Sequence, residues 1–310
     1  MLDIWFIGTG NFAALCLENF LKNNVSFSKI ITGMPTRSGR NNKEIPSHVE
    51  LFASQKNLNL IRTDSLSKND VLISDFKNNT PDLIFVIDFG QIIREPFLNG
   101  AKFGCLNIHP SILPRWRGAA PIQRALLNND KKIGVSVFRL VQEMDAGNIL
   151  AQNEFDVNDS DSAKNLYEKL ASEGVNLATN IIHKINNSDF ISEIKQDDSL
   201  ATYAHKLEKS DFEISLDYTS QQIFNTVRAL NMSGGAFLKL KNNKRLKIFS
   251  VKKNILKSDS PNQVLNLENN PVISCGDFSI ELLEVQPESK KIMSGKNWAS
   301  GLRLNIHDSL

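Results

Sequence analysis

Short apolar runs alternate with helical patterns along the first 190 positions of the chain. Runs rich in Val, Ile, Leu and Phe predict buried strands, and they lie at 2–7, 29–32, 58–62, 82–87, 106–109, 134–141 and 149–155. Segments with helical spacing lie between them, at 12–22, 47–56, 68–78, 120–128 and 162–185. Strands that alternate with helices are typical of βαβ units with right-handed crossovers. The pattern therefore predicts an α/β fold with a Rossmann-like, mainly parallel sheet.

The pattern changes after a polar stretch at 186–199, which is typical of a linker. A helical segment at 220–230 is followed by short strand patterns at 237–241, 246–251, 264–267, 272–274 and 279–285. Several short strands with turn signals predict a small β-barrel. We therefore expect a first domain at 1–190, a linker at 191–204 and a second domain at 205–310.

Composition adds few constraints to this picture. The chain has 310 residues, of which 41% are hydrophobic and 23% charged, and this is ordinary for a soluble globular protein. Three widely spaced cysteines form neither a disulfide framework nor a metal-ligand pattern, so we expect a reducing compartment and no metal. No apolar stretch approaches the ~18 residues of a membrane span. These features predict a cytoplasmic protein, which we expect to be a monomer.

Polar residues gather at the end of one predicted strand. Asn107 and His109 are two positions apart, so their side chains share one face. Pro110 cannot donate to a sheet ladder, which makes His109 the last residue of that strand. Asp145 follows the next strand, and in a parallel sheet neighbouring strand ends are close in space. The alternative is that His109 is a buried histidine bonded to a backbone carbonyl and Asn107 caps the strand end.

The motifs around these residues match a known family. The run N-I-H-P-S-I-L-P-R-W-R-G-A-A-P-I-Q-R begins at Asn107, and M-D-A-G-N-I-L begins at Met144. Both resemble the methionyl-tRNA formyltransferases. Folate-dependent formyltransferases in general share Asn-x-His and a later Asp, whereas W-R-G-A-A-P-I-Q is particular to the tRNA enzymes. The chain departs from the family's N-P-W-P-G-A with N-M-S-G-G-A at 231–236.

The resemblance implies a fold, two substrates and their contacts. The C-terminal barrel is expected to be OB-like, the co-substrate 10-formyltetrahydrofolate, and the substrate methionyl-initiator tRNA. Expected folate contacts are Ser111, Ile112, Leu113, Pro114, Asp88 and Gly90. Expected tRNA contacts are Arg37, Arg40, Lys43, Phe12, Arg115, Arg117, Lys244, Arg245 and Lys247.

Simpler interpretations of several of these residues stay open. Ile112 and Leu113 are equally suited to a core, since apolar side chains are usually inside. Asp88 and Gly90 suit an ordinary strand-end turn, and Arg117 suits a residue that ties its loop down. Residues 239–257 contain eight Lys or Arg and no acid, and such a run is commonly a solvated hairpin.

A dinucleotide site is a weaker interpretation of the first glycine turn. Gly8, Gly10 and Ala13 satisfy G-x-G-x-x-A. The fingerprint also needs an acidic residue at the end of the second strand to hold the ribose. That strand ends in Thr32 and Gly33, so we expect no dinucleotide.

Formyl transfer to an amine needs a neutral amine, stabilisation of an oxyanion and transfer of a proton to the leaving nitrogen. Asn107 can donate its amide N–H to the oxyanion. His109 can stabilise the oxyanion as imidazolium and assist proton transfer. Asp145 can orient His109 or order a water that carries the proton. No nucleophilic side chain is needed, so we expect a sequential ternary mechanism.

Two other functions compete with this hypothesis. One is a folate-dependent formyltransferase that acts on an amino sugar nucleotide or on glycinamide ribonucleotide. The other is an RNA-binding module with a relic catalytic domain, which the basic run would suit. A formylation assay with all three amine substrates separates these possibilities.

Overall fold

The computed structural model describes residues 2–38 and 42–310. Contacts divide the chain into two compact units. The first contains 1–118, 132–156 and 167–204, and the second contains 119–131, 157–166 and 205–310. The predicted domain limits at 190 and 205 stay a prediction.

The first unit is built on a seven-stranded sheet with the order β10-β9-β7-β6-β1-β2-β5. Its strands are β1 (Ile4–Gly8), β2 (Lys29–Gly33), β5 (Leu60–Thr63), β6 (Leu83–Ile87), β7 (Cys105–His109), β9 (Lys132–Arg139) and β10 (Ile149–Asp156). The ladders that join β5, β2, β1, β6 and β7 are parallel. The predicted α/β fold with a mainly parallel sheet is confirmed.

One part of the predicted topology is wrong, because β9 runs antiparallel to β7. Leu106 pairs with Arg139 and His109 with Ser136. The carboxyl end of β9 therefore lies beside the start of β7. The expectation that Asp145 follows a parallel neighbour of β7 must be corrected.

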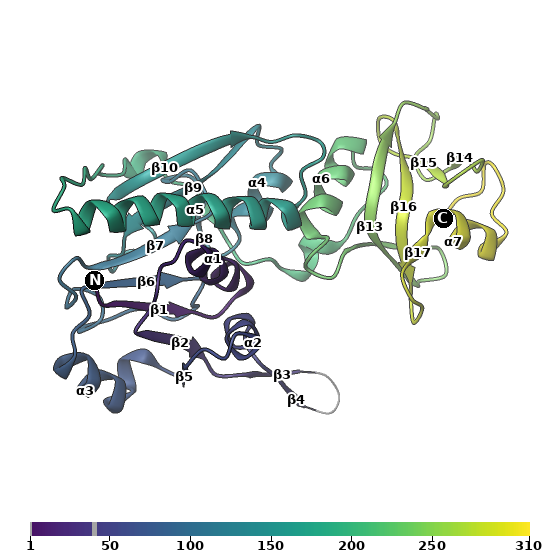
Figure 1. Ribbon diagram of the computed structural model, residues 1–310. Coiled ribbons are helices and arrows are strands. Elements are labelled where there is room, and N and C mark those ends of the chain that lie inside the picture. The colour runs from purple at the N-terminus through teal and green to yellow at the C-terminus, as the bar shows by residue number, and fades with distance from the viewer. Residues whose placement is uncertain (1, 39–41) are drawn as a thin grey trace. The chain divides into compact units, whose positions relative to one another are not determined.

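Helices cover both faces of this sheet. Figure 1 shows α1 (Asn11–Lys22) and α5 (Ala163–Asn186) on one face. The ring of Phe20 in α1 contacts Phe85 of β6, and a side chain at Gly174 of α5 would meet Ile108 and Val135. The opposite face packs Trp5, Ile84 and Cys105 against α3 (Asp70–Asn78). Asn107 and His109 belong to this second face by strand alternation.

The other elements of the first unit are short. They are α2 (His48–Gln55), η1 (Leu66–Lys68), η2 (Asp198–Leu200), the hairpin of β3 (Thr36–Ser38) and β4 (Lys43–Ile45), and the pair β8 (Arg117–Gly118) and β11 (Tyr203–Ala204). The sequence predicted α2, but its patterns gave no sign of the β3–β4 hairpin or of the β8–β11 pair.

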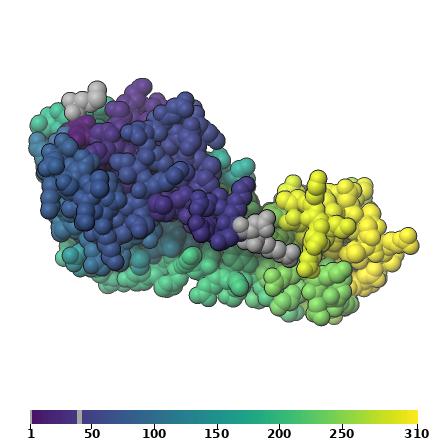
Figure 2. Space-filling model, turned by 90° about the horizontal axis from the view of Figure 1, so that it is seen from below, coloured from purple at the N-terminus to yellow at the C-terminus, as the bar shows by residue number. Residues whose placement is uncertain are grey.

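The second unit contains a six-stranded antiparallel sheet, with β12-β13-β16-β15-β14 in order and β17 paired to β16. Its elements are α4 (Pro121–Leu127), η3 (Lys209–Phe212), α6 (Ser220–Leu230), β12 (Ala236–Lys239), β13 (Arg245–Asn254), β14 (Val264–Asn266), β15 (Val272–Ser274), β16 (Ser279–Pro287), β17 (Met293–Ser294) and α7 (Gly295–Leu302). The predicted small β-domain is confirmed, and α7 is an element that the strand patterns did not predict. Figure 2 shows the C-terminal residues of this unit in yellow.

Candidate formyl-transfer site

His109 ends β7, and its two ring nitrogens face different partners. Its Nε2 lies 2.8 Å from the backbone oxygen of Trp116. A carbonyl oxygen only accepts, so Nε2 must carry the hydrogen. Nδ1 then faces Oδ2 of Asp145 at 3.7 Å, and Phe138 meets the ring edge to face at 6.3 Å between centroids. The residue is only 5% exposed. It is therefore a buried histidine with a carbonyl partner, as the alternative interpretation expected. It also faces a carboxylate, which that interpretation did not include.

Asp145 reaches His109 through a returning loop. Residues 140–148 leave β9 beside Leu106 and travel back toward the carboxyl end of β7. Gly118 donates its N–H to Oδ2 of Asp145 at 2.8 Å. Gln196 donates from Nε2 to the backbone oxygens of Asp145 and Gly147, at 2.8 and 2.7 Å. The predicted meeting of the two side chains is therefore observed, although the reason given from the sequence was wrong.

Asn107 supplies the open polar group of the cluster. Its side chain is half-buried and lies on the same face as His109. Among the described residues its amide has no hydrogen-bond partner. A donor that is neither buried nor engaged is available to an incoming oxygen, as an oxyanion site requires.

The loop after His109 is braced from β9 and β10. Ser136, which is fully buried, donates to the backbone oxygen of Ser111 at 2.7 Å. Gln152 donates to Ser136 and to the backbone oxygen of Leu113. Ser111 and Leu113 are buried by this bracing. Of the four residues expected to contact folate here, Ile112 and Pro114 are the half-buried ones.

Two of the expected tRNA contacts lie inside the fold. Arg117 is 4% exposed and donates to Gln196 and to Asp198, so it ties the loop down, as the simpler interpretation had it. Phe12 is 3% exposed and packs edge to face on Tyr167. Both side chains are therefore buried in this fold, and their assignment as tRNA contacts stays a prediction.

The remaining basic candidates lie at the surface or outside the described residues. Arg37 and Lys43 are exposed on the β3–β4 hairpin, where Arg37 pairs with Glu44 at 3.2 Å. Arg40 lies outside the described residues. Arg115 is half-buried, with its guanidinium 4.8 Å from the Trp116 ring. In the second unit, Lys244, Arg245 and Lys247 are exposed at and beside the start of β13.

The residues at the end of β6 differ from each other. Gly90 is exposed, and its positive φ of 72° is a conformation that favours glycine. The carboxyl of Asp88 instead turns toward the start of α1, where a Cβ at Gly10 would lie 1.8 Å from its Oδ2. Gly90 is therefore open to a ligand, whereas the Asp88 carboxyl faces the start of α1.

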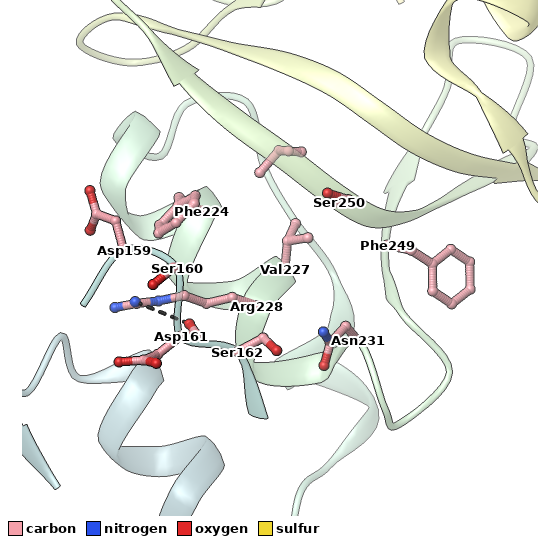
Figure 3. A pocket seen from close by; sticks show the side chains of 11 residues that line it. Asp159, Ser160, Asp161, Ser162, Phe224, Val227, Arg228, Asn231, Phe249 and Ser250 are labelled. Atoms are coloured by element: carbon pink, nitrogen blue, oxygen red, sulfur yellow. Dashed lines mark hydrogen bonds between the residues drawn. The ribbon is translucent and has the colours of Figure 1, made fainter. Parts of the chain in front are cut away.

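Each unit has its own cavity. One of about 410 Å³ lies in the first unit between Leu113, Pro114, the start of β10 and residues 194–197. One of about 150 Å³ lies in the second unit, and the side chain of Arg228 lines it (Figure 3). Arg228 donates to Asn225 and to the backbone oxygen of Asn158. The guanidinium of Arg228 is thus engaged by the protein itself, and we assign it a structural role in the second cavity.

Other kinds of site find no support in the described residues. No group of three His, Cys, Asp or Glu side chains comes together there as metal ligands. Burial raises the pKa of Cys275 to about 12 and that of Cys105 still further, so neither thiol is a nucleophile at neutral pH. No helix among the described residues is long and apolar enough to cross a membrane.

Gln196 supports the loops of the candidate site, and the sequence gave no sign of this. It lies in the polar stretch interpreted as a linker, is 5% exposed, and joins Arg117 to the Asp145 loop. No motif or periodicity marks it, because its three partners come from segments about 50 to 80 residues away.

We expect Gln196→Ala to lower the free energy of unfolding of the first unit by about 2 kcal/mol, since it leaves buried donors and acceptors unpaired. Urea denaturation followed by a probe in that unit measures this change, with the exposed Gln55→Ala as control. A variant as stable as the wild type would remove Gln196 from this role.

Comparisons with known proteins give consistent results. The model of the formyl transferase family matches residues 3–182, and that of the formyl transferase C-terminal domain matches 206–303. The methionyl-tRNA formyltransferase of Protochlamydia amoebophila is 33% identical over 308 residues, which cover 98% of this chain and 96% of that one. The methionyl-tRNA formyltransferase of Pelagibacter ubique is 34% identical over 291 residues, 93% of this chain and 92% of that one.

Solved structures share the fold. HypX from Aquifex aeolicus in complex with tetrahydrofolic acid matches with a TM-score of 0.67 at 16% identity, over all of this chain and 49% of that one. WlaRD, a sugar 3N-formyl transferase solved with dTDP and 5-N-formyl-THF, matches with a TM-score of 0.59 at 25% identity, over 94% of this chain and 99% of that one.

Proposed function

The chain belongs to the methionyl-tRNA formyltransferases, and from this premise we propose that Asn107, His109 and Asp145 carry out the transfer of the formyl group. The enzyme formylates methionyl-tRNA with 10-formyltetrahydrofolate. The observation that carries the site assignment is the 3.7 Å approach of Asp145 Oδ2 to His109 Nδ1 beside the open amide of Asn107.

The first demand of the reaction is an oxyanion donor. The amine nitrogen attacks the formyl carbon, a C–N bond forms, and the formyl oxygen gains negative charge. Asn107 offers an N–H with no competing partner among the described residues. Removing one such donor in a comparable site costs about 3 kcal/mol in the barrier.

The second demand is a route for the proton. The attacking nitrogen loses a proton and N10 of the folate gains one as the C–N10 bond breaks. The His109–Asp145 pair provides the route, because the Trp116 carbonyl holds the hydrogen on Nε2 and leaves Nδ1 facing the carboxylate, and both of these groups can accept a proton. Oδ1 of Asp145 has no hydrogen-bond partner among the described residues, so it is the oxygen that meets the substrate or a water.

The co-substrate is proposed to bind at the carboxyl ends of β6 and β7. Ligands of open α/β sheets bind at such ends. Gly90 is open there, and Ile112 and Pro114 are half-buried on the loop that follows His109. Ile92, 70% exposed, and Met144, 58% exposed, are large apolar side chains on the loops after β6 and β9, and exposed apolar groups suit an aromatic ring system.

The tRNA is proposed to be the initiator species, bound through the β3–β4 hairpin and the start of β13. We expect the double variant Arg37→Ala/Lys43→Ala to raise KM for methionyl-tRNA about tenfold and to reduce its salt dependence, because each lost cation is one fewer phosphate contact. Arg40→Ala is expected to act in the same direction.

Steady-state kinetics at two salt concentrations measure this effect, with KM for the folate as internal reference and the exposed Lys22→Ala as control. An unchanged KM for tRNA would separate the hairpin from tRNA binding.

A sugar nucleotide is the second candidate substrate, because the similar WlaRD structure is a sugar 3N-formyl transferase. Formylation of charged initiator tRNA, glycinamide ribonucleotide and an amino sugar nucleotide should be compared under one set of conditions. We expect turnover of the tRNA alone. Faster turnover of the sugar would reverse the assignment.

A further inference from the structure

Helix α1 receives its N-terminal cap from a distant residue. Its own N-cap position is Gly10, which has no side chain, whereas a cap normally supplies a side-chain oxygen to the first turn. The carboxyl of Asp88 lies at that position, 1.8 Å from where a Cβ of Gly10 would be, and the backbone N–H of Phe12 lowers the pKa of this carboxyl. The backbone oxygen of Asp88 also accepts the N–H groups of Thr9 and Gly10, at 3.1 and 3.0 Å.

Gly10 is needed for this arrangement because of space. Its φ of −78° and ψ of −177° are extended values that any residue adopts. A Cβ at this position, however, would lie 1.8 Å from Oδ2 of Asp88. The absence of a side chain at position 10 is therefore what admits the carboxyl.

The order of the strands places this contact at the sheet edge that also carries the reacting histidine. Gly8 pairs with Ile87, and Phe85 pairs with Leu106, both in parallel ladders. The carboxyl ends of β1, β6 and β7 therefore lie at the same edge of the sheet.

The carboxyl of Asp88 is kept at this edge at a cost. Burial raises its pKa to about 6, and the N–H of Phe12 only partly opposes this rise. The residue as a whole remains exposed. The buried thiol of Cys16 in α1 faces it, and burial together with Asp88 raises the pKa of that thiol, which stays protonated. The turn at 9–12 adds no charged group.

The raised pKa of Asp88 makes the stability of the fold depend on pH. The pKa of Asp88 in the fold is above its ordinary value, so the fold favours the protonated acid. The stabilisation is full below about pH 4 and is lost as the pH rises through about 6. At neutral pH the ionised group lowers stability, and such groups concentrate at functional sites.

We propose that Asp88 is a positioning residue of the formyl-transfer site, which caps α1 through the space left by Gly10 and thereby fixes the turn at 9–12 at the sheet edge that carries His109. The effect on turnover rests on the proposed function. The coupling between Gly10 and Asp88 is a property of the fold and can be measured without a substrate.

A double-mutant cycle in thermal stability tests the coupling. Gly10→Ala is expected to lower Tm by about 5 °C through overpacking, and Asp88→Gly by about 3 °C through loss of the cap. The double variant is expected to be no less stable than Asp88→Gly alone, because the clash has gone. Gly301→Ala, at a glycine with no atom near its missing Cβ, is the control and should not lower Tm. Additive losses in the double variant would overturn the proposal.

Kinetics test the positioning role at a temperature where every variant is folded. Asp88→Gly is expected to lower kcat about tenfold, with KM for both substrates within about twofold, because the turn shifts without losing a substrate contact. Asp88→Asn keeps an accepting oxygen and should restore kcat to within about twofold. Gly10→Ser in the Asp88→Gly background returns the cap to its usual position and should restore kcat as well. Failure of both to restore kcat would overturn the positioning role.

The pH dependence gives an independent measure. Asp88→Asn should have a higher Tm than the wild type at pH 7.5 and the same Tm at pH 4, because only the wild type ionises between them. An equal difference at both pH values would contradict the proposal. If no amine were formylated by the wild type, these Tm measurements would still decide the coupling.

Discussion

Replacing His109 by Ala is expected to lower kcat for the formylation of methionyl-tRNA by about a thousandfold, the range attributed to positioned acid–base groups. The ring is the group that joins Asp145 to the reacting edge, and its loss removes the Nδ1 partner of the carboxylate. Saturating both substrates in a steady-state assay isolates kcat from binding.

The fold should survive this change. The ring makes one hydrogen bond, to the Trp116 carbonyl, and one edge contact with Phe138. Circular dichroism and tRNA binding should therefore stay close to those of the wild type. His183→Ala, at an exposed position of α5, is the matched control with unchanged kcat. Turnover of His109→Ala within tenfold of the wild type would remove the histidine from the mechanism.

Replacing Asp145 by Asn is expected to lower kcat by about a hundredfold to a thousandfold, because the amide keeps the volume and the Gly118 contact but loses the charge opposite Nδ1. Asp145→Ala should be at least as slow, since the loop also loses its anchor to Gly118. The measurement is kcat in both variants, with KM for each substrate recorded alongside.

The exposed Asp189→Asn provides the control for the same chemical change. The combination His109→Ala/Asp145→Asn should be no slower than the slower single variant, because residues that act as one unit are not additive. Multiplied losses in the combination would mean that the two side chains work separately.

Strand and helix patterns in the sequence were sufficient to predict the sheet, but they do not encode strand direction. A helix between β7 and β9 suggested a crossover and hence a parallel pair. That helix, α4, belongs to the second unit and contacts α6 there, so it does not return the chain to the start of the sheet. Because no helix of the first unit connects β7 to β9 among the described residues, β9 can pair antiparallel to β7.

Motifs predicted the cluster of Asn107, His109 and Asp145 better than the residues that support it. Asn107 and His109 are two positions apart on one strand, so alternation alone brings them together. Arg117 and Phe12 are buried by segments that are distant in the sequence. The residues next to them in the sequence therefore did not reveal that their side chains lie inside the fold. The contact of Gly10 with Asp88 joins positions 78 residues apart, and nothing local to either residue announces it.

The segment between the two regions that match the family models, residues 183–205, matters for the design of truncated proteins. Gln196 and Asp198 hold Arg117, and β11 pairs with β8 through Tyr203. A fragment that ends at position 190 would keep Asn107, His109 and Asp145 but lack the residues that hydrogen-bond to their loops. A minimal catalytic fragment should therefore extend beyond Ala204, because the polar stretch that resembles a linker stabilises these loops.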